Sequence, residues 1–228
     1  MKPTAQLFLI TLCICASLAT TAQARAQTRV SMSSDFNLQR SLKKGQKYWA
    51  VGQTVTVQFN ATPVDAAYAW VAYFSNGRFG NALIADAKSP VTTPSTIPYE
   101  SATKMRYKHI SLGWKHYYIG TAVADSRKFG LYSMTGLGLM LGLVQNAQSV
   151  VLDTMQYHLP VLPGKENFKR LTLDLGIGGE VAMGADLYFY AELKAVLPLT
   201  DAPNRYILDN KYTPYTAMAA LGFRILFN

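Results

Sequence analysis

The stretch TPYTAMAALGFRILFN, from Thr213 to Asn228, decides the fold of this chain. From Tyr215 onward every second residue is apolar, whereas the residues between them include Gly222 and Arg224. Successive side chains of a β-strand point to opposite faces. The pattern therefore predicts a strand with one long apolar face and one face that carries an arginine.

The same two-residue period recurs along the chain, in segments of about ten or more residues. A period of two held over such a length indicates strands and not helices. Together with the last segment, the pattern predicts eight strands, which match or exceed the ~9–11 residues that a tilted strand needs to cross a bilayer. The other segments are residues 29–42, 47–59, 66–74, 105–120, 129–143, 168–183 and 186–197.

The N-terminal residues have the features of a secretory signal peptide. Lys2 precedes the apolar stretch Leu7–Ala19, and small residues suited to cleavage follow up to Ala26. We therefore expect a signal peptide over residues 1–26 and a single mature domain over residues 27–228. Because the two cysteines, Cys13 and Cys15, lie in the signal peptide, the mature domain is expected to have no disulfide, no thiolate metal site and no thiol nucleophile. We also expect no cofactor.

The composition favours a membrane protein that does not cross the membrane with helices. Half of the 228 residues are hydrophobic and only 15% are charged, against about 25% in soluble domains. Yet no run of ~20 apolar residues follows the signal peptide, so no transmembrane helix is expected. Without Lys2 and Arg25, 20 of the 22 basic residues remain against 13 acidic ones, a net charge of +7. This charge suits anionic lipids, whereas the lack of a dense basic run argues against nucleic-acid binding.

The predicted connections alternate in length over most of the chain. Two of them are long, Ser75–Ala102 and Val144–Asn167, and Thr200–Tyr212 is of medium length. The connections between them are shorter, at Asn60–Val64, Thr121–Lys128 and Met183–Asp186. Membrane barrels have short turns in the periplasm and longer loops outside the cell, so we expect the two long segments to be external loops.

On these features the chain resembles the small outer-membrane β-barrel proteins of bacteria. The final LGFRILF, with the aromatic Phe227 near its end, resembles the signal that the barrel-insertion machinery reads in such proteins. The resemblance implies an all-β fold: a closed antiparallel up-and-down transmembrane β-barrel of eight strands, with both termini in the periplasm. It implies a location in the bacterial outer membrane and contact with the insertion machinery.

Charged residues share the face of the last three strands that a barrel would turn inward. If the turn at Met183–Asp186 is centred on Gly184, Asp174 pairs with Lys194; a turn centred one residue later pairs Gly176 with Lys194 instead. An eight-stranded barrel is only wide enough for side chains to fill it, so we expect a polar plug and no open pore. The charged residues are Arg170, Asp174, Glu180, Glu192, Lys194 and Arg224.

His109 and Ser111 are the only candidates for a catalytic pair. Two residues apart on a strand, they point the same way, and a hydroxyl beside an imidazole is a possible nucleophile. The pair resembles the His-x-Ser of outer-membrane lipid A deacylases. However, Leu112 stands where that family has Asn, no Glu follows before Glu166, and both residues are expected to face the lumen. We therefore expect no enzyme activity.

The expected outer surface carries aromatic and basic residues at its edges. Arg106 and Lys108, on the lipid-facing side of their strand, are candidates to contact lipopolysaccharide phosphates or to extend to the headgroups. Aromatic side chains are expected to form girdles at the lipid boundaries. They are Trp49, Trp70, Trp114, Tyr118, Phe168, Phe189, Tyr215 and Phe223.

These features predict a non-enzymatic outer-membrane protein, with a structural or surface-interaction role carried by its external loops. Its expected partners are outer-membrane lipids, the insertion machinery, and an extracellular or periplasmic protein that the sequence does not name. Three alternatives stay open: a lipid-modifying hydrolase, a narrow channel, and a soluble periplasmic barrel that binds a ligand inside.

Overall fold

Eight strands form a closed barrel in the computed structural model, which describes residues 29–123, 129–184, 186–201, 205–207 and 215–227. The predicted signal peptide lies outside the described residues, as do parts of the connections Thr121–Lys128 and Thr200–Tyr212. The strands are β1 (Arg29–Ser41), β2 (Trp49–Asn60), β3 (Asp65–Ala87), β4 (Thr96–Ile119), β5 (Phe129–Gln148), β6 (Tyr157–His158), β7 (Gly164–Gly184), β8 (Leu187–Pro198) and β9 (Thr216–Phe227). The two-residue strand β6 pairs with the end of β3 and lies outside the ring.

The barrel closes through β1, which pairs antiparallel with both β2 and β9. Met32, for example, lies opposite Val57 on one side and Ile225 on the other. Every other neighbour pair in the wall is antiparallel as well, in the order β1-β2-β3-β4-β5-β7-β8-β9. The predicted eight-stranded up-and-down barrel, including the strand expected over residues 29–42, is therefore confirmed.

The long apolar face of β9 lies on the outside of the barrel. Leu221 and Phe223 are 57% and 51% exposed, whereas Arg224 points inward and is 2% exposed. A lipid bilayer has no water to pair with free backbone groups, so only a sheet without edges can cross it. The apolar exterior and the closed wall together describe a transmembrane barrel. Among the described residues, no helix is long and apolar enough to span a membrane.

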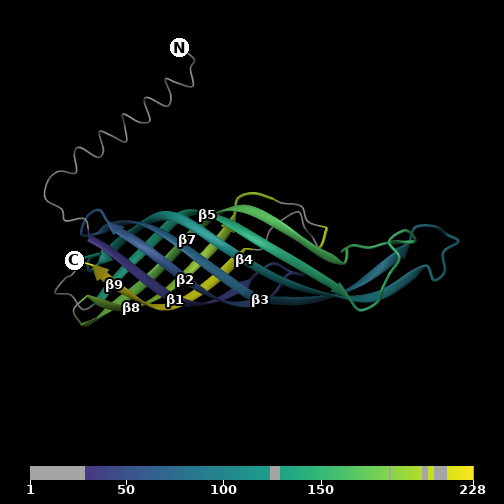
Figure 1. Cartoon of the computed structure of the whole chain (residues 1–228), viewed down its shortest axis with the longest axis horizontal. Helices are drawn as coiled ribbons and strands as arrows, with labels where there is room; N and C mark the ends of the chain where they lie inside the picture. Colours follow the sequence, from purple (N-terminus) through teal and green to yellow (C-terminus); the bar gives the residue numbers. More distant parts are fainter. Residues whose placement is uncertain (1–28, 124–128, 185, 202–204, 208–214, 228) are drawn as a thin grey trace, which may run out of the picture.

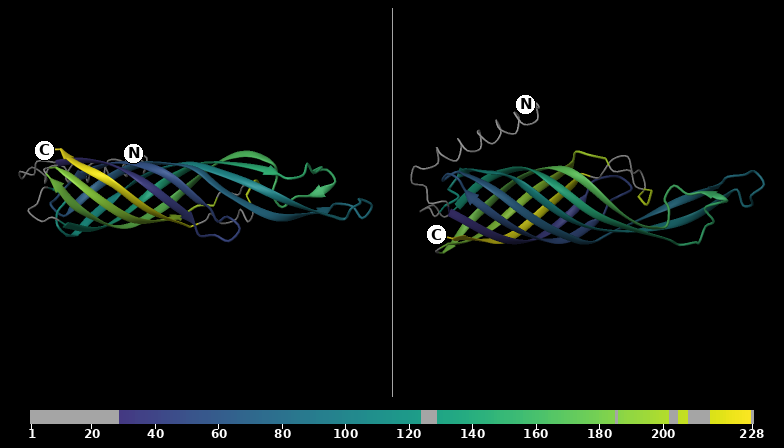
Figure 2. Two further views of the ribbon diagram at one scale, coloured as in Figure 1. Left: turned by 90° about the horizontal axis from the view of Figure 1, so that it is seen from below. Right: turned by 45° about the horizontal axis from the view of Figure 1, so that its top comes forward.

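The two ends of the barrel differ strongly. β1 begins and β9 finishes at the same end, which we call the inner end (Figure 1). From the opposite, outer end a long hairpin of β3 and β4 projects well beyond the wall (Figure 2). Because external extensions are long and periplasmic turns are short in membrane barrels, we assign the outer end to the outside of the cell.

The prediction that Ser75–Ala102 is a loop is wrong. β3 continues to Ala87 and β4 begins at Thr96, so only residues 88–95 connect them. We call residues 75–102 the outer hairpin. Above the membrane both faces of a strand meet water or loops, so the apolar-polar alternation that marks a membrane strand fades there. For the same reason, β5 and β7 extend into the predicted loop Val144–Asn167, and their connection covers only residues 149–163.

The connection between β5 and β7, which we call the crossing loop (residues 149–163), holds the outer hairpin in place. Its strand β6 pairs with the end of β3, with Asp86 opposite His158. Tyr157 donates a hydrogen bond from its hydroxyl to the Pro94 carbonyl, 3.1 Å away. Beyond the membrane, Tyr99 packs in a small apolar core with Ala85, Leu152 and Tyr157, and burial raises the pKa of its phenol. An isolated hairpin is marginally stable in water, and these contacts supply the packing that it lacks.

Gly142 is expected to be intolerant of any side chain, because a Cβ at this position would overlap the ring of Phe168 on β7. Gly142→Ala should lower the free energy of unfolding by about 1–3 kcal/mol, the usual cost of overpacking. Urea unfolding of the barrel in lipid vesicles measures this change.

Gly80→Ala is the matched control for Gly142→Ala, since a Cβ there would meet only the Ser101 carbonyl oxygen at 3.7 Å. Adding Phe168→Leu to Gly142→Ala should recover part of the loss by making room. If both alanine variants unfold at the same urea concentration, the steric explanation is wrong.

Candidate functional site

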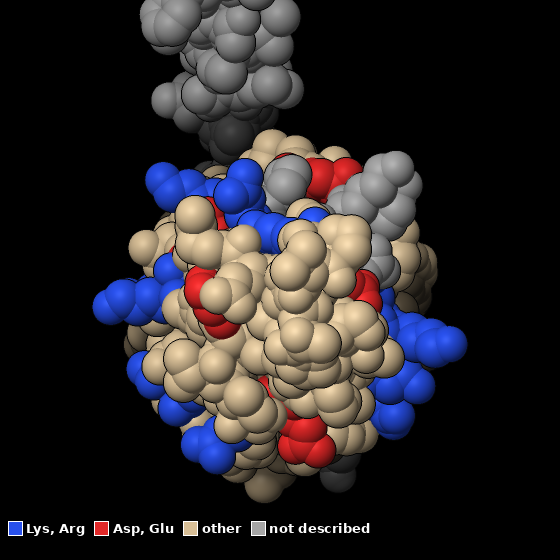
Figure 3. Space-filling model, turned by 90° about the vertical axis from the view of Figure 1, so that its right-hand side faces the viewer, with Lys and Arg blue, Asp and Glu red and all other residues tan. Residues whose placement is uncertain are grey.

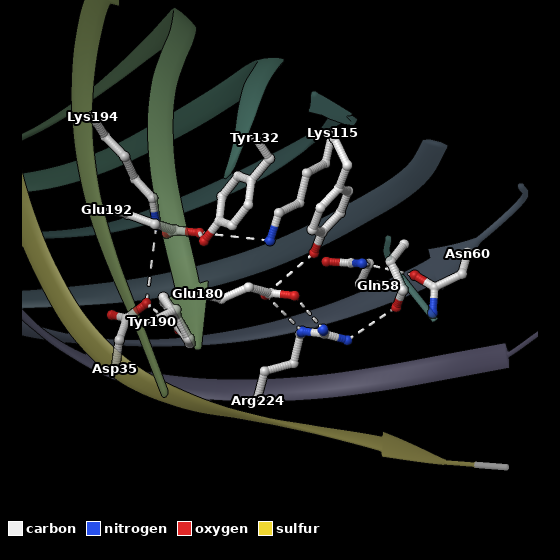
Figure 4. Close-up of polar contacts among 12 residues, drawn as sticks. Asp35, Gln58, Asn60, Lys115, Tyr132, Glu180, Tyr190, Glu192, Lys194 and Arg224 are labelled. Atoms are coloured by element: carbon white, nitrogen blue, oxygen red, sulfur yellow. Dashed lines mark hydrogen bonds and ion pairs between the residues drawn. The ribbon is translucent and has the colours of Figure 1, made fainter. Parts of the chain in front are cut away.

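The charged side chains predicted for the lumen all point into the barrel, and each is at most 7% exposed. They come from β7, β8 and β9, and Figure 4 shows several of them directed at one another. In so narrow a space a charge must find a partner, because burying an unpaired charge is very costly. These six residues are Arg170, Asp174, Glu180, Glu192, Lys194 and Arg224.

Arg224 and Glu180 form the ion pair nearest the inner end. The Arg224 Nε donates to Glu180 Oε2 at 3.0 Å, and its Nη2 donates to Oε1, so the pair is bidentate. Arg224 also donates to the Ala122 carbonyl at 3.2 Å and lies over the ring of Tyr188. Tyr117 donates its hydroxyl to Glu180 at 3.3 Å. The guanidinium thus joins β9 to β7 and to the turn after β4.

Lys194 is the centre of a second cluster, and Figure 4 shows it beside Glu192 and directed at Asp35. Its Nζ lies 2.6 Å from Glu192 Oε2 and 3.9 Å from Asp35 Oδ2. Tyr190 donates its hydroxyl to Asp35 at 2.8 Å. The ammonium also lies 5.6 Å from the ring centre of Trp70 on β3, the strand opposite β8 in the ring. Side chains therefore meet across the full width of the lumen.

Lys115 extends this cluster toward β4 and β5. Its Nζ lies 3.9 Å from Glu192 Oε1 and 3.4 Å from the ring centre of Tyr132, which donates its own hydroxyl to Glu192 at 2.8 Å. Neither Asp35 nor Lys115 belongs to the charged residues predicted for the lumen. Lys115 shares the inward parity of His109 and Ser111, so the two-residue period would have found it. Asp35 lies on the strand with the weakest alternation, and no comparable signal marks it.

The turn after β7 settles the two registers that the sequence left open. Gly184 has a positive φ and the strand is irregular between Ala182 and Gly184, which places Gly176 opposite Lys194. Asp174 instead lies opposite Val196 and accepts a hydrogen bond from Thr172 at 3.0 Å. The pairing of Asp174 with Lys194 across β7 and β8 is therefore wrong, and the second register is correct.

His109 and Ser111 are both buried in the lumen, at 0% and 1% exposure. The Nε2 of His109 is directed at β7, 2.9 Å from Thr172 Oγ1 and 3.3 Å from Asp174 Oδ2, and not at Ser111. The ring of Trp70 packs edge-on against the imidazole. A lipid acyl ester outside the wall has no access to this group, so the geometry does not support a lipid-modifying hydrolase.

An apolar cluster fills the lumen at its outer end. Phe74 and Tyr107 stack with their ring centres 4.9 Å apart, and Tyr48 stacks on Phe79. Ile207, from the connection between β8 and β9, is buried in the same cluster. The prediction that Trp70 and Phe168 belong to the aromatic girdle is wrong, because both point inward; Trp49, Trp114, Tyr118, Tyr215 and Phe223 are exposed on the outside.

Arg106 and Lys108 are exposed on the outer surface of β4, above the apolar belt. Leu112 and Ile110 follow on the same face toward the membrane centre and are 63% and 42% exposed. Among the described residues, no group of three or more His, Cys, Asp or Glu side chains is arranged to hold a metal ion.

Comparisons with known proteins address the fold alone. The sequence matches no protein-family model and no curated protein. The structure is similar to Neisserial surface protein A (9% identity, TM-score 0.54, covering 87% of this chain and 97% of that one). It is also similar to a major outer membrane protein of Thermus thermophilus (9% identity, TM-score 0.52, 87% and 99% covered). The fold is thus that of small bacterial outer-membrane barrels, and with the apolar exterior it places the chain in an outer membrane.

Proposed function

We propose that this outer-membrane barrel is a non-enzymatic surface protein that binds a protein partner through the outer hairpin and the crossing loop. One observation carries the proposal: large apolar side chains are exposed on these two segments, where they have neither lipid nor protein cover. Single exposed apolar residues are ordinary on protein surfaces, but a group of them on two adjoining segments that project from the barrel marks an interaction site. They are Ile84 (56% exposed), Val91 (88%), Val151 (100%) and Met155 (81%).

The outer hairpin is organised before any partner arrives. Its strands continue the hydrogen-bonded ladder of the wall, and β6 and the small core around Tyr99 and Tyr157 fix it from the side. Lys88 adds a hydrogen bond from its Nζ to the Thr154 carbonyl at 2.7 Å. A segment that is already ordered loses less conformational entropy on binding, which favours a recognition role.

The lumen supports the non-enzymatic part of the proposal. Charged side chains meet across it, as Lys194 and Trp70 do, and the aromatic cluster occupies its outer end. This filling disfavours a narrow channel. The apolar exterior disfavours a soluble barrel with a ligand inside, because such a barrel would turn its apolar faces inward. No observation specifically favours the lipid-modifying hydrolase, the narrow channel or the soluble ligand-binding barrel.

The proposal is tested by photo-crosslinking on intact cells. A photoreactive aromatic amino acid at position 151 should give a discrete protein adduct, because the fully exposed Val151 would lie in the interface. Val91→Asp in the same chain should reduce that adduct about tenfold or more, as expected when a central apolar contact of ~1.4 kcal/mol or more is lost.

Val64→Asp is the matched control for Val91→Asp, since Val64 is 36% exposed in the turn at the inner end. It should leave the adduct unchanged. All variants must retain the compact form that migrates differently on unboiled gels. If folded protein gives no adduct from position 151, or if both aspartate variants reduce the adduct equally, the proposed surface is wrong.

A further inference from the structure

Where the structure describes the side chains, the exposed basic residues lie in the outer half of the molecule. Seen from the outer end, they surround the periphery of the molecule, whereas the centre is mostly uncharged (Figure 3). All exposed Lys and Arg residues whose side chains are described lie on the outer parts of the strands or in the external connections. They are Arg40, Lys44, Lys47, Arg78, Lys88, Arg106, Lys108, Lys165, Lys169 and Arg205.

Part of this ring forms a groove on the wall between β4 and β7. The register places Arg106 opposite Leu143, and Lys108 opposite Leu141. On the other side of β5, Leu141 lies opposite Lys169. Two partly buried leucines on β5 therefore form the floor, and cations stand on both sides. These residues line a surface hollow of about 410 Å³, which we call the cationic groove.

The groove lies at the upper edge of the apolar belt. One row deeper on the outer face, the same three strands carry Ile110, Leu139 and Leu171, which are 42%, 37% and 52% exposed. On β3, Tyr73 lies opposite Lys108 of β4. Aromatic residues are common at this level, the boundary between lipid and water. A ligand that fits here therefore has an anionic head at the level of Lys108 and acyl chains that extend down along β5.

A second basic row lies directly above the first. Lys104 is opposite Arg78 on β3 and Gln145 on β5, and Gln145 is opposite Lys165 on β7. Neighbouring strands are about 4.8 Å apart, so long basic side chains from β4 and β7 can reach the same anion over β5. Glu166 is the acidic residue nearest in sequence, and it falls on the opposite parity of β7 from Lys165 and Lys169.

We propose that the cationic groove binds lipopolysaccharide, with Arg106, Lys108 and Lys169 on the phosphates of its lipid anchor and an acyl chain that runs from Leu141 down over Leu139. Several cations on both sides of an apolar floor match a lipid with more than one phosphate better than a phospholipid with one. Charge-assisted hydrogen bonds to phosphate oxygens are among the strong polar interactions of proteins. This inference does not depend on the protein partner proposed for the outer hairpin.

The test measures lipopolysaccharide binding to the purified full-length barrel in detergent by native mass spectrometry. A variant with Arg106→Gln, Lys108→Gln and Lys169→Gln should bind at least about tenfold more weakly, because it loses the cations on both sides of the floor. The matched control, with Lys44→Gln, Lys47→Gln and Arg205→Gln, removes the same charge from the outer end but leaves the groove intact. It should bind within about twofold of the unaltered protein.

Two further ligands distinguish a specific site from general attraction. Dephosphorylated lipopolysaccharide should bind the unaltered protein as weakly as intact lipopolysaccharide binds the groove variant. Phosphatidylglycerol, which has one phosphate, should not displace intact lipopolysaccharide. The proposal is overturned if the groove variant and the control lose equal affinity, if dephosphorylation has no effect, or if phosphatidylglycerol competes equally.

Discussion

Arg224→Met is expected to lower the free energy of unfolding by about 3–5 kcal/mol, the cost of leaving a buried charge without its partner. Glu180 would lose its bidentate contact with the guanidinium and keep the 3.3 Å hydrogen bond from Tyr117. Methionine has nearly the length of the arginine stem, so the change removes charge with little change in packing. Urea unfolding in lipid vesicles, followed by the gel shift of the folded form, measures the effect.

The double variant Arg224→Met with Glu180→Gln separates charge from packing. It removes both members of the pair and should recover most of the lost stability, because a neutral side chain is much cheaper to bury than an unpaired carboxylate. Glu180→Gln alone should also be destabilising, since it leaves the guanidinium unpaired. Equal losses in Arg224→Met and in the double variant would show that the ion pair itself is unimportant.

Lys194→Met is expected to be similarly severe, with a loss of about 3–5 kcal/mol. Two carboxylates depend on this ammonium, Glu192 at 2.6 Å and Asp35 at 3.9 Å. After the substitution Glu192 would keep the more distant Lys115, at 3.9 Å, and Asp35 would keep the hydroxyl of Tyr190. The same unfolding assay applies.

Lys44→Met is the control for Lys194→Met, because it removes an exposed lysine at the outer end and should change the stability by no more than about 0.5 kcal/mol. Adding Asp35→Asn to Lys194→Met should recover part of the loss. If Lys194→Met is as mild as Lys44→Met, the lumen must be wet enough to screen its charges, and our view of a filled interior would be wrong.

Much of the fold was predictable because a membrane imposes a strong pattern on the sequence. In β9 each residue faces either lipid or lumen, so the alternation of outward and inward side chains from Ala217 to Phe227 can be read directly from the sequence. The same rule is sufficient to place Arg224, Glu180 and Lys194 inside the barrel. The sequence also predicts that the wall is closed, because the unpaired backbone groups of a sheet edge are too costly to expose to hydrocarbon.

The remainder depended on contacts that no local pattern reveals. Beyond the membrane the outer hairpin has no lipid to select apolar residues, so the sequence pattern predicts a loop over Ser75–Ala102 where the structure has strands. Which residue of β7 lies opposite Lys194 depends on where the turn beside Gly184 is centred, and the structure places Gly176 there. The carboxylates that Lys194 contacts lie on other strands, Glu192 on β8 and Asp35 on β1. The sequence does not show that Trp70 faces inward and not toward the girdle, because aromatic residues suit both a lipid boundary and a crowded lumen.

The continuity of β3 and β4 through the membrane has a mechanical consequence. Their ladder runs from Asp65 opposite His116 to Asp86 opposite Thr96, with one irregularity near Gly77. Hydrogen bonds between antiparallel strands lie perpendicular to the strands, so a pull along the hairpin would load many of them in shear at once. The force would pass directly into a wall without edges. A partner bound at the tip of the outer hairpin would thus be connected to the membrane by a rigid element and not by a flexible linker.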